Sequence, residues 1–510
     1  MTNVLEYLEQ TLISMPNPNK TAFADENETL SFADISATAR SIGSFLHARD
    51  IHRSPVAVFM EKSPAMVGAF LGTAYGGNYY VPLDAEMPAF RIKLILETLN
   101  PPLLICDSAT ASLAAEWELP YPVVNFSEAK SHPINESALA DIRRRAIDTD
   151  PLYVVFTSGS TGIPKGVVAC HRSVIDYIDN LSNVLDVTEH TVFGNQSPLY
   201  LDACLKEIYP TLKFGATTYL IPRGLFMFPV KLIEYINERG INTICWVASA
   251  LGLVAGLGAL AKNTPHSLQT VAFGSEVFPI KHFRRWREAL PNAKFIHLYG
   301  PTEATGMSTY YVADRPFTED ETIPIGQPFP NTEIVLLDEG GKAVELGGIG
   351  EICIRGTGLS LGYFGDPSRT QASFIQNPLS PFPDTIYKTG DLGRYENGDL
   401  YFISRKDHQI KHMGHRIELA EIEWLAARYD DIEMVCAVFD DIPSHIVLYY
   451  LAREGTEKKQ VMAYLKANLP RYMMPHAIFE LKELPLTPGG KVDRVGLLAK
   501  YRDERMAKRR

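Results

Sequence analysis

The sequence of 510 residues lacks the features that mark membrane, secreted and nucleic-acid-binding proteins. No stretch reaches about 18 consecutive apolar residues, so we expect no membrane-spanning helix. Residues 1–14 have no basic start followed by a long apolar run, which argues against a secretory signal peptide. The net charge is −11 and no Lys/Arg block dominates, so neither nucleic acid nor a membrane is expected as a main partner.

The cysteines are few and show no pattern of their own. Neither CxxC nor a spacing typical of metal sites occurs, which suits reduced thiols in the cytoplasm. We therefore expect a cytoplasmic protein in which most cysteines are small core residues. They are Cys106, Cys170, Cys204, Cys245, Cys353 and Cys436.

The length and the 46% hydrophobic content predict at least two domains with large buried cores. Helical and β-type patterns alternate up to about residue 150 and again over 217–298, which predicts parallel sheets with crossover helices. Residues 323–404 change to short strands with turn signals, and charge density rises after Arg405. The predicted fold is α/β: two α/β subdomains and a small β-rich subdomain, followed by a small α+β C-terminal domain.

A glycine-rich loop follows an apolar, strand-like run in the segment YVVFTSGSTGIPKG at 153–166. Gly159 and Gly162 allow the backbone to approach a ligand closely, and the hydroxyls and one lysine suit phosphate oxygens. The loop is not a Walker A motif, because Pro164 and Gly166 stand where Gly and Ser or Thr are needed. A plain linker is the alternative, but an amphipathic helix is expected to follow at once. The polar groups are on Thr157, Ser158, Ser160, Thr161 and Lys165.

This loop and six other motifs, in the same order, resemble those of the acyl-adenylate-forming enzymes. Within them the sequence is similar to the amino-acid adenylation domains of nonribosomal peptide synthetases and to D-alanine:carrier protein ligases. The resemblance covers nearly the whole chain. The other motifs are LSFADIS at 30–36, LYGPTEAT at 298–305, GEICIRGTGLSLGYFGDP at 350–367, YKTGDLGRYENGDLYFISRKD at 387–407, KHMGHRIELAEIE at 411–423 and LPLTPGGKVDR at 484–494.

The resemblance implies a large domain at 1–406 that binds ATP and the amino acid, and a mobile lid at 407–510 that turns about Asp407. It also implies a catalytic lysine, Lys491, between the substrate carboxylate and the α-phosphate. Such a cation is needed because two anions about 4 Å apart repel by about 4 kcal/mol at an effective dielectric constant near 20. Without the other motifs, Lys491 would be read as an exposed lysine after a turn.

Further roles follow from the same resemblance. Glu303 matches the Mg²⁺ ligand, Thr302 a phosphate contact and Tyr299 a residue on the adenine face. Asp391 and Arg405 match the binders of the ribose hydroxyls; otherwise they would be a turn cap and a surface pair. Lys411 and Gly414 would face the site during thioester formation. The triphosphate is assigned to Thr157, Ser158, Gly159, Thr161 and Lys165.

The substrate assignment begins at Asp202, which aligns with the aspartate that pairs with the ammonium of an amino acid. Leu201 departs from the family, which usually has an aromatic residue there. The other matching pocket positions are Ala203, Lys206, Cys245, Val271, Phe273, Leu298, Gly306 and Met307, together with Lys491.

Lys206 is the polar exception in that pocket. Four residues after Asp202, it would share a helix face with it, and a buried unpaired ammonium is costly. A second acid group on the substrate, as in aspartate, glutamate or a β-amino diacid, would offset that cost. The alternative is that Lys206 pairs with Asp202 or reaches solvent, which would leave a small pocket suited to alanine.

The sequence therefore predicts a ligase that uses ATP and Mg²⁺ to form an aminoacyl-AMP. With neither a carrier-domain LGxxS motif nor a preceding condensation domain, we expect transfer to the phosphopantetheine thiol of a separate carrier protein. The rivals are a D-alanine ligase, an acyl- or aryl-CoA ligase, which Asp202 disfavours, and a catalytically silent adenylate-binding protein.

Overall fold

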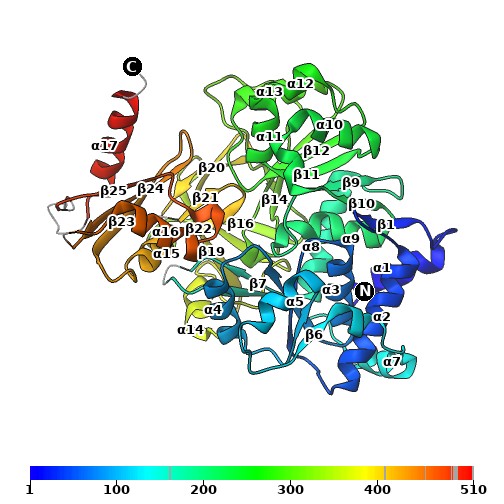
Figure 1. Ribbon diagram of the computed structural model, residues 1–510. Helices are drawn as coiled ribbons and strands as arrows, with labels where there is room; N and C mark the ends of the chain where they lie inside the picture. Colours follow the sequence, from blue (N-terminus) through cyan, green and yellow to red (C-terminus); the bar gives the residue numbers. More distant parts are fainter. Residues whose placement is uncertain (160–161, 407–408, 454, 484, 486–491, 508–510) are drawn as a thin grey trace. The chain divides into compact units, whose positions relative to one another are not determined.

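The structure is a computed structural model that describes residues 1–159, 162–406, 409–453, 455–483, 485 and 492–507 (Figure 1). Contacts within the chain divide it into two compact units. The predicted domain division at 406 stays a prediction, as does the hinge at Asp407, which lies outside the described residues. The first unit contains residues 1–85, 99–155 and 166–406, and the second contains residues 86–98, 156–165 and 407–510.

The first unit contains a nine-stranded sheet in the order β15-β14-β13-β12-β11-β9-β10-β1-β2. Its central strands, from β13 to β1, pair in parallel, whereas β14, β15 and β2 pair antiparallel. The strands are β1 (Thr21–Ala24), β2 (Thr29–Ser31), β9 (Val192–Asn195), β10 (Thr217–Leu220), β11 (Thr243–Val247), β12 (Thr270–Gly274), β13 (Lys294–Tyr299), β14 (Thr309–Val312) and β15 (Gln327–Pro328).

A six-stranded sheet has the order β6-β5-β3-β4-β7-β8. The strand pairs β3–β4, β3–β5, β4–β7 and β5–β6 are parallel, so the α/β prediction is confirmed for both large sheets. The strands are β3 (Pro55–Met60), β4 (Tyr79–Asp84), β5 (Leu104–Cys106), β6 (Val123–Asn125), β7 (Pro151–Thr157) and β8 (Lys165–Cys170).

The predicted β-rich region is an antiparallel sheet in the order β16-β17-β19-β18, with β20 paired to β19. Asp391 of β19 lies directly opposite Arg405 of β20. These strands are β16 (Thr332–Leu337), β17 (Gly350–Gly356), β18 (Phe374–Gln376), β19 (Thr385–Glu396) and β20 (Asp399–Arg405).

Several helices of the first unit, α2 among them, begin at a residue whose side chain caps the helix. The Ser31 hydroxyl accepts the Asp34 N–H and the Asp34 carboxylate accepts the Ser31 N–H, which forms a capping box for α2. The helices are α1 (Leu5–Ser14), α2 (Phe32–Ala48), α3 (Pro64–Tyr75), α5 (Ser108–Ala115), α6 (Phe126–Lys130), α7 (Glu136–Arg145), α8 (His171–Leu185), α9 (Leu205–Phe214), α10 (Pro229–Glu238), α11 (Ala248–Gly256), α12 (Ala259–Lys262), α13 (Ile280–Ala289) and α14 (Pro367–Ser373), with short 3₁₀ turns η1 (Asp202–Cys204), η2 (Arg223–Met227) and η3 (Thr302–Ala304).

Two hydrophobic clusters cover opposite faces of the nine-stranded sheet. One cluster includes Cys245 and Leu298 and joins the sheet to α1, α2, α3, α8 and α9. The other includes Val271 and Phe273 and lies under α10, α11 and α13, which surround β11 and β12 in Figure 1. Among the described residues, no helix has both the length and the hydropathy needed to cross a membrane.

The second unit contains a three-stranded sheet, β23-β24-β25, and the hairpin of β21 and β22. Met413 and Gly414 form the hairpin turn with φ values of 52° and 79°, a left-handed pair that favours glycine at the second position. The elements are α4 (Ala89–Leu99), β21 (Gln409–His412), β22 (His415–Glu418), α15 (Leu419–Ala426), β23 (Ile432–Asp440), β24 (His445–Ala452), α16 (Lys458–Asn468), η4 (Arg471–Met473), β25 (Ala477–Glu480) and α17 (Arg494–Ala507).

Candidate active site

Strand β13 ends at Tyr299 and leads into the tight turn that carries Thr302 and Glu303. The backbone is so close here that a Cβ on Gly300 would lie 2.2 Å from the Gly306 carbonyl oxygen, so only glycine fits. Glu303 is fully buried, and its Oε1 accepts a hydrogen bond from the Tyr363 hydroxyl at 2.8 Å. The turn therefore holds a carboxylate away from bulk water at the end of a parallel strand.

Tyr299, Asp391 and Arg405 form one polar cluster, which we name the Asp391 cluster. The Tyr299 hydroxyl donates to Asp391 Oδ2 at 2.6 Å, and the Arg405 guanidinium forms an ion pair with the other carboxylate oxygen. Burial and the adjacent Asp391 charge raise the pKa of the Tyr299 phenol well above its usual value, so the phenol stays protonated. The structure thus brings together the residues predicted for adenine and ribose, and their roles stay predictions.

The glycine-rich loop belongs to the second compact unit. The Ser158 hydroxyl donates to the Arg416 carbonyl at 2.6 Å and accepts the Glu418 N–H at 3.1 Å, so it is bonded to the backbone of β22. Gly162 has φ +81°, and a Cβ there would lie 2.3 Å from the Trp424 ring. Thr157, Gly159 and Lys165 are described, whereas Ser160, Thr161 and the predicted catalytic Lys491 lie outside the described residues.

Asp202 lies in η1, immediately before α9, and retains partial exposure. Burial raises the pKa of its carboxyl, against a hydrogen bond from Thr302 and the positive charge of Lys206, which lower it. Asp202 is thus in contact with the turn that carries Glu303, although about 100 residues separate the two in sequence. Ala203 follows in the same short turn.

Lys206 is 3% exposed, so nearly all of its side chain is buried. It takes part in none of the ion pairs found among the described residues, and the direct pair with Asp202 is therefore not formed. Its charge nevertheless lowers the pKa of Asp202 and of the neighbouring Glu207. Of the two alternatives, the ion pair with Asp202 is not observed among the described residues, and the contact of Lys206 with a substrate stays a prediction.

The remaining pocket assignments separate into two groups. Cys245, Leu298 and Met307 pack in the cluster on the α8 and α9 face, whereas Val271 and Phe273 pack on the opposite face. Successive side chains of a strand point to opposite faces, so these two groups do not line one cavity through the middle of the sheet. Phe273 stacks on His297 with ring centroids 5.0 Å apart. Gly306 lies against the Tyr177 ring, which a Cβ would approach to 2.8 Å.

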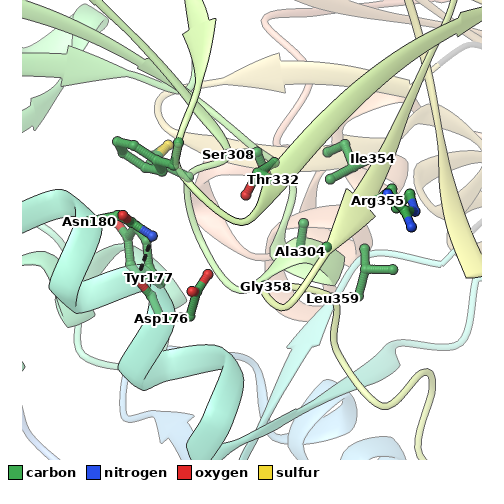
Figure 2. A pocket seen from close by; sticks show the side chains of 13 residues that line it. Asp176, Tyr177, Asn180, Ala304, Ser308, Thr332, Ile354, Arg355, Gly358 and Leu359 are labelled. Atoms are coloured by element: carbon green, nitrogen blue, oxygen red, sulfur yellow. Dashed lines mark hydrogen bonds between the residues drawn. The ribbon is translucent and has the colours of Figure 1, made fainter.

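A narrow pocket opens beside this region, between α8 and the strands β16 and β17 (Figure 2). Of the predicted residues it includes only Met307. Figure 2 shows Asn180 turned back toward its own helix, where its Nδ2 donates to the Asp176 carbonyl at 2.9 Å. Because Tyr299, Asp391 and Arg405 do not line it, the pocket is separate from the Asp391 cluster.

Sequence reasoning missed three polar groups of this region: the buried Glu207 and Tyr363, and the partly buried Lys62. Glu207 had a detectable signal, because LKEIY at 205–209 places two charges inside an otherwise apolar helical pattern. Lys62 follows a strand of the other sheet, and nothing in its local sequence distinguishes it from an exposed lysine. All six cysteines are free and buried, as predicted.

A sequence model of the family described as AMP-binding enzyme matches residues 14–364. The chain belongs to this family. It is 32% identical over 490 residues to bacitracin synthase 1 of Bacillus licheniformis. The aligned region covers 95% of this chain but only 9% of that synthase. It is 31% identical to the D-alanine–D-alanyl carrier protein ligase of Bacillus licheniformis, covering 94% of this chain and 95% of that ligase.

Among solved structures, the chain matches holo-PA1221, a nonribosomal peptide synthetase protein that contains adenylation and carrier domains. The TM-score is 0.81 at 25% identity, with 98% of this chain and 84% of that chain covered. The match confirms the predicted fold of a large N-terminal and a small C-terminal part. The chain spans about a tenth of the length of the synthases it matches first.

Proposed function

We propose that the chain is an ATP-dependent, AMP-forming ligase that activates an amino acid and passes it to a separate carrier protein. The observation that carries the proposal is the position of Asp202, partly buried and close enough to Thr302 and Glu303 for both side chains to affect the pKa of its carboxyl. A carboxylate there suits the ammonium of an amino acid, beside the strand end where the nucleotide residues converge. The match to nearly the full length of a carrier protein ligase supports the choice of acceptor.

In the proposed reaction the substrate carboxylate attacks the α-phosphate, and pyrophosphate leaves. Asp202 holds the substrate ammonium, Asp391 and Arg405 hold the ribose, and Lys491 lies between the two reacting anions and lowers their repulsion. The aminoacyl-AMP is then attacked by the phosphopantetheine thiol of the carrier, which releases AMP. Lys411 of β21 and Gly414 of the hairpin turn are proposed to face the site in that second step.

Magnesium is proposed as the metal that accompanies ATP. The fully buried Glu303 is a single carboxylate, and the described residues contain no cluster of three side chains that could hold a metal by themselves. This fits Mg²⁺, which is commonly bound by one or two carboxylates together with substrate phosphates. Glu303 would hold the metal, which would neutralise charge on the departing pyrophosphate.

The substrate is proposed to carry a second acid group, with an aspartate, glutamate or β-amino diacid as the leading class. The support is Lys206, a buried ammonium outside every ion pair of the described residues. Burying such a charge is costly unless a partner arrives, and a substrate carboxylate is a suitable partner. The rival is D-alanine or another small amino acid, which the name of one relative favours. The six free cysteines support a reducing compartment, and we propose the cytoplasm.

Amino-acid-dependent exchange of pyrophosphate into ATP tests this proposal, with α- and β-amino acids and their diacids compared on wild type and Lys206→Met. We expect diacids to give the fastest exchange, and Lys206→Met to lower their kcat/KM by about 10- to 100-fold, as for loss of a charge-assisted hydrogen bond. Small neutral amino acids should change little. A ranking led by alanine and unaffected by the substitution would disprove the acidic substrate, and no exchange with any acid would favour a silent adenylate-binding protein.

A further inference from the structure

Glu207 is a buried carboxylate that the proposed reaction does not use. It follows Lys206 on α9 and has no exposed surface. Its Oε2 accepts a hydrogen bond from Asn195 Nδ2 at 3.3 Å, whereas its Oε1 has no hydrogen-bond partner among the described residues. Burial raises the pKa of Glu207 to about 7. A buried carboxylate with one bare oxygen is rare in folded proteins, so this group calls for an explanation.

Lys62 brings a second positive charge to the same place. It follows β3 of the six-stranded sheet, and its Nζ donates to the carbonyl oxygens of Asn195 at 3.2 Å and Gln196 at 3.4 Å. Burial lowers the pKa of Lys62 to about 8, and the charge of Glu207 opposes that change. Lys62 is therefore anchored to the backbone after β9, while its charge acts on Glu207.

The two lysines and Glu207 leave a positive charge in excess. When Glu207 is ionised it offsets one ammonium, and when it is protonated both ammonium charges remain. The Lys62 ammonium already donates to two carbonyl oxygens. The ionisation of Glu207 therefore changes mainly how strongly the Lys206 ammonium can attract a bound ligand. Glu207 thus competes with any acid group of a bound substrate for the charge of Lys206.

The other groups that face Glu207 do not titrate near neutral pH. Burial raises the pKa of the thiols of Cys204 and Cys245 and of the Tyr177 phenol, so all three stay neutral. Asp202 has a raised pKa as well, but it would pair with the ammonium that every amino acid substrate carries. Because Lys206 also acts on Asp202, the comparison of wild type with Glu207→Gln, which share Asp202, isolates the part of the pH dependence that comes from Glu207.

We propose that Glu207 is a positioning residue for substrate charge, whose carboxylate sets how strongly Lys206 holds the second acid group of the substrate. This inference rests on the proposed function, because it assumes that Lys206 contacts the substrate. Under this inference Glu207 determines substrate specificity without touching the substrate. It also makes the choice between an acid and its amide depend on pH. An acid should be preferred over its amide most strongly when Glu207 is protonated.

The test compares acid and amide substrates of equal size, L-aspartate with L-asparagine and L-glutamate with L-glutamine. The kcat/KM of pyrophosphate exchange is measured between pH 5.5 and 7.5, where Lys62 stays mostly protonated, on wild type, Glu207→Gln and Glu207→Asp. We expect the acid-to-amide ratio of wild type to fall about fivefold as the pH rises, since a unit charge appears near Lys206. The change should lie in KM rather than in kcat.

Glu207→Gln keeps the shape and the bond from Asn195 but cannot ionise, so its ratio should stay at the high level that wild type shows at low pH. Glu207→Asp keeps the charge and should restore the fall. Equal pH profiles for wild type and Glu207→Gln would overturn the inference. If Glu207→Gln does not fold, a flat wild-type profile would overturn it equally.

Two failures can be told apart. If diacids are preferred and Lys206→Met removes that preference, but Glu207→Gln leaves the pH profile unchanged, this inference alone is wrong. If no diacid is preferred and Lys206→Met changes nothing, the proposed acidic substrate is wrong and the role of Glu207 is overturned with it.

Discussion

The Asp391 cluster and the group of Lys62, Lys206 and Glu207 both bury charge, yet they are satisfied to different degrees. Asp391 has an ion pair on one oxygen and a tyrosine hydroxyl on the other. Glu207 has one weak amide contact and a bare oxygen, and Lys206 has no ion pair among the described residues. Both oxygens of Asp391 have partners without a ligand. In the second group the Lys206 ammonium has no ion pair within the described part of the chain, so a ligand can balance its charge.

The difference follows from how each cluster is built. Asp391 and Arg405 are opposite each other on neighbouring antiparallel strands, so the backbone register fixes their distance. Lys206 and Glu207 are consecutive on α9, and Lys62 comes from the other sheet, so no backbone register fixes the distances between the three charges. A pair of side chains whose distance is fixed by the strand register suits a part of the ligand that is the same in every reaction, such as the proposed ribose. A group of charges that no backbone register holds together suits the part of the ligand that differs between substrates, here the proposed amino acid side chain.

The largest expected effect is on the Asp391 cluster. Asp391→Ala removes the carboxylate paired with the largely buried Arg405 guanidinium, which should lower the free energy of unfolding by about 3–5 kcal/mol. Urea denaturation of the apo protein measures this. The matched control is Arg394→Ala, which breaks an exposed pair with Glu396 on the same sheet and should cost less than about 1 kcal/mol. Equal losses for the two variants would contradict the description of a buried, interdependent pair.

The next effect concerns the pH dependence of stability. The pKa of Glu207 is raised from 4.5 to about 7 on folding, so the folded state favours the protonated form. That contribution to stability is complete below about pH 4.5 and is lost as the pH rises through about 7. Glu207→Gln cannot ionise, so its stability relative to wild type should increase from pH 5 to pH 8, by at most about 3 kcal/mol.

Denaturant unfolding of both proteins at pH 5 and pH 8 gives this difference directly. Glu396→Gln, which removes an exposed carboxylate, serves as the control and should show the same stability difference at both pH values. A constant difference for Glu207→Gln would mean that Glu207 does not titrate differently in the folded protein.

The smallest expected effect is on recognition of the amino group. Asp202→Asn should lower kcat/KM for the amino acid by about 10- to 100-fold, the size of a charge-assisted hydrogen bond, and leave the KM for ATP unchanged. Wild type should discriminate against the analogue without the α-amino group, and Asp202→Asn should lose that discrimination. A loss that fell on ATP instead would place Asp202 with the nucleotide.

Much of the fold was predictable because it depends on local pattern. The alternation of helical and β-type patterns up to about residue 150 and over 217–298 predicted the two large parallel sheets, and Ser31 with Asp34 marks the start of α2 through contacts three residues apart. The structure alone showed that residues 86–98 and 156–165 pack with the C-terminal part, and that the Ser158 hydroxyl is bonded to β22. Those are contacts between segments that sequence periodicity does not relate.

For the candidate site, the sequence by itself determined which residue types recur in the order of the family: the glycine-rich loop, the turn of Thr302 and Glu303, and Asp391 and Arg405. Only the tertiary structure decided that Val271 and Phe273 lie on the other face of the sheet from Cys245, and that Glu207 is buried beside a lysine from a different sheet. The physical reason is that burial and charge compensation depend on what packs against a residue, and Lys62, whose charge acts on Glu207, lies 145 residues before it in the chain.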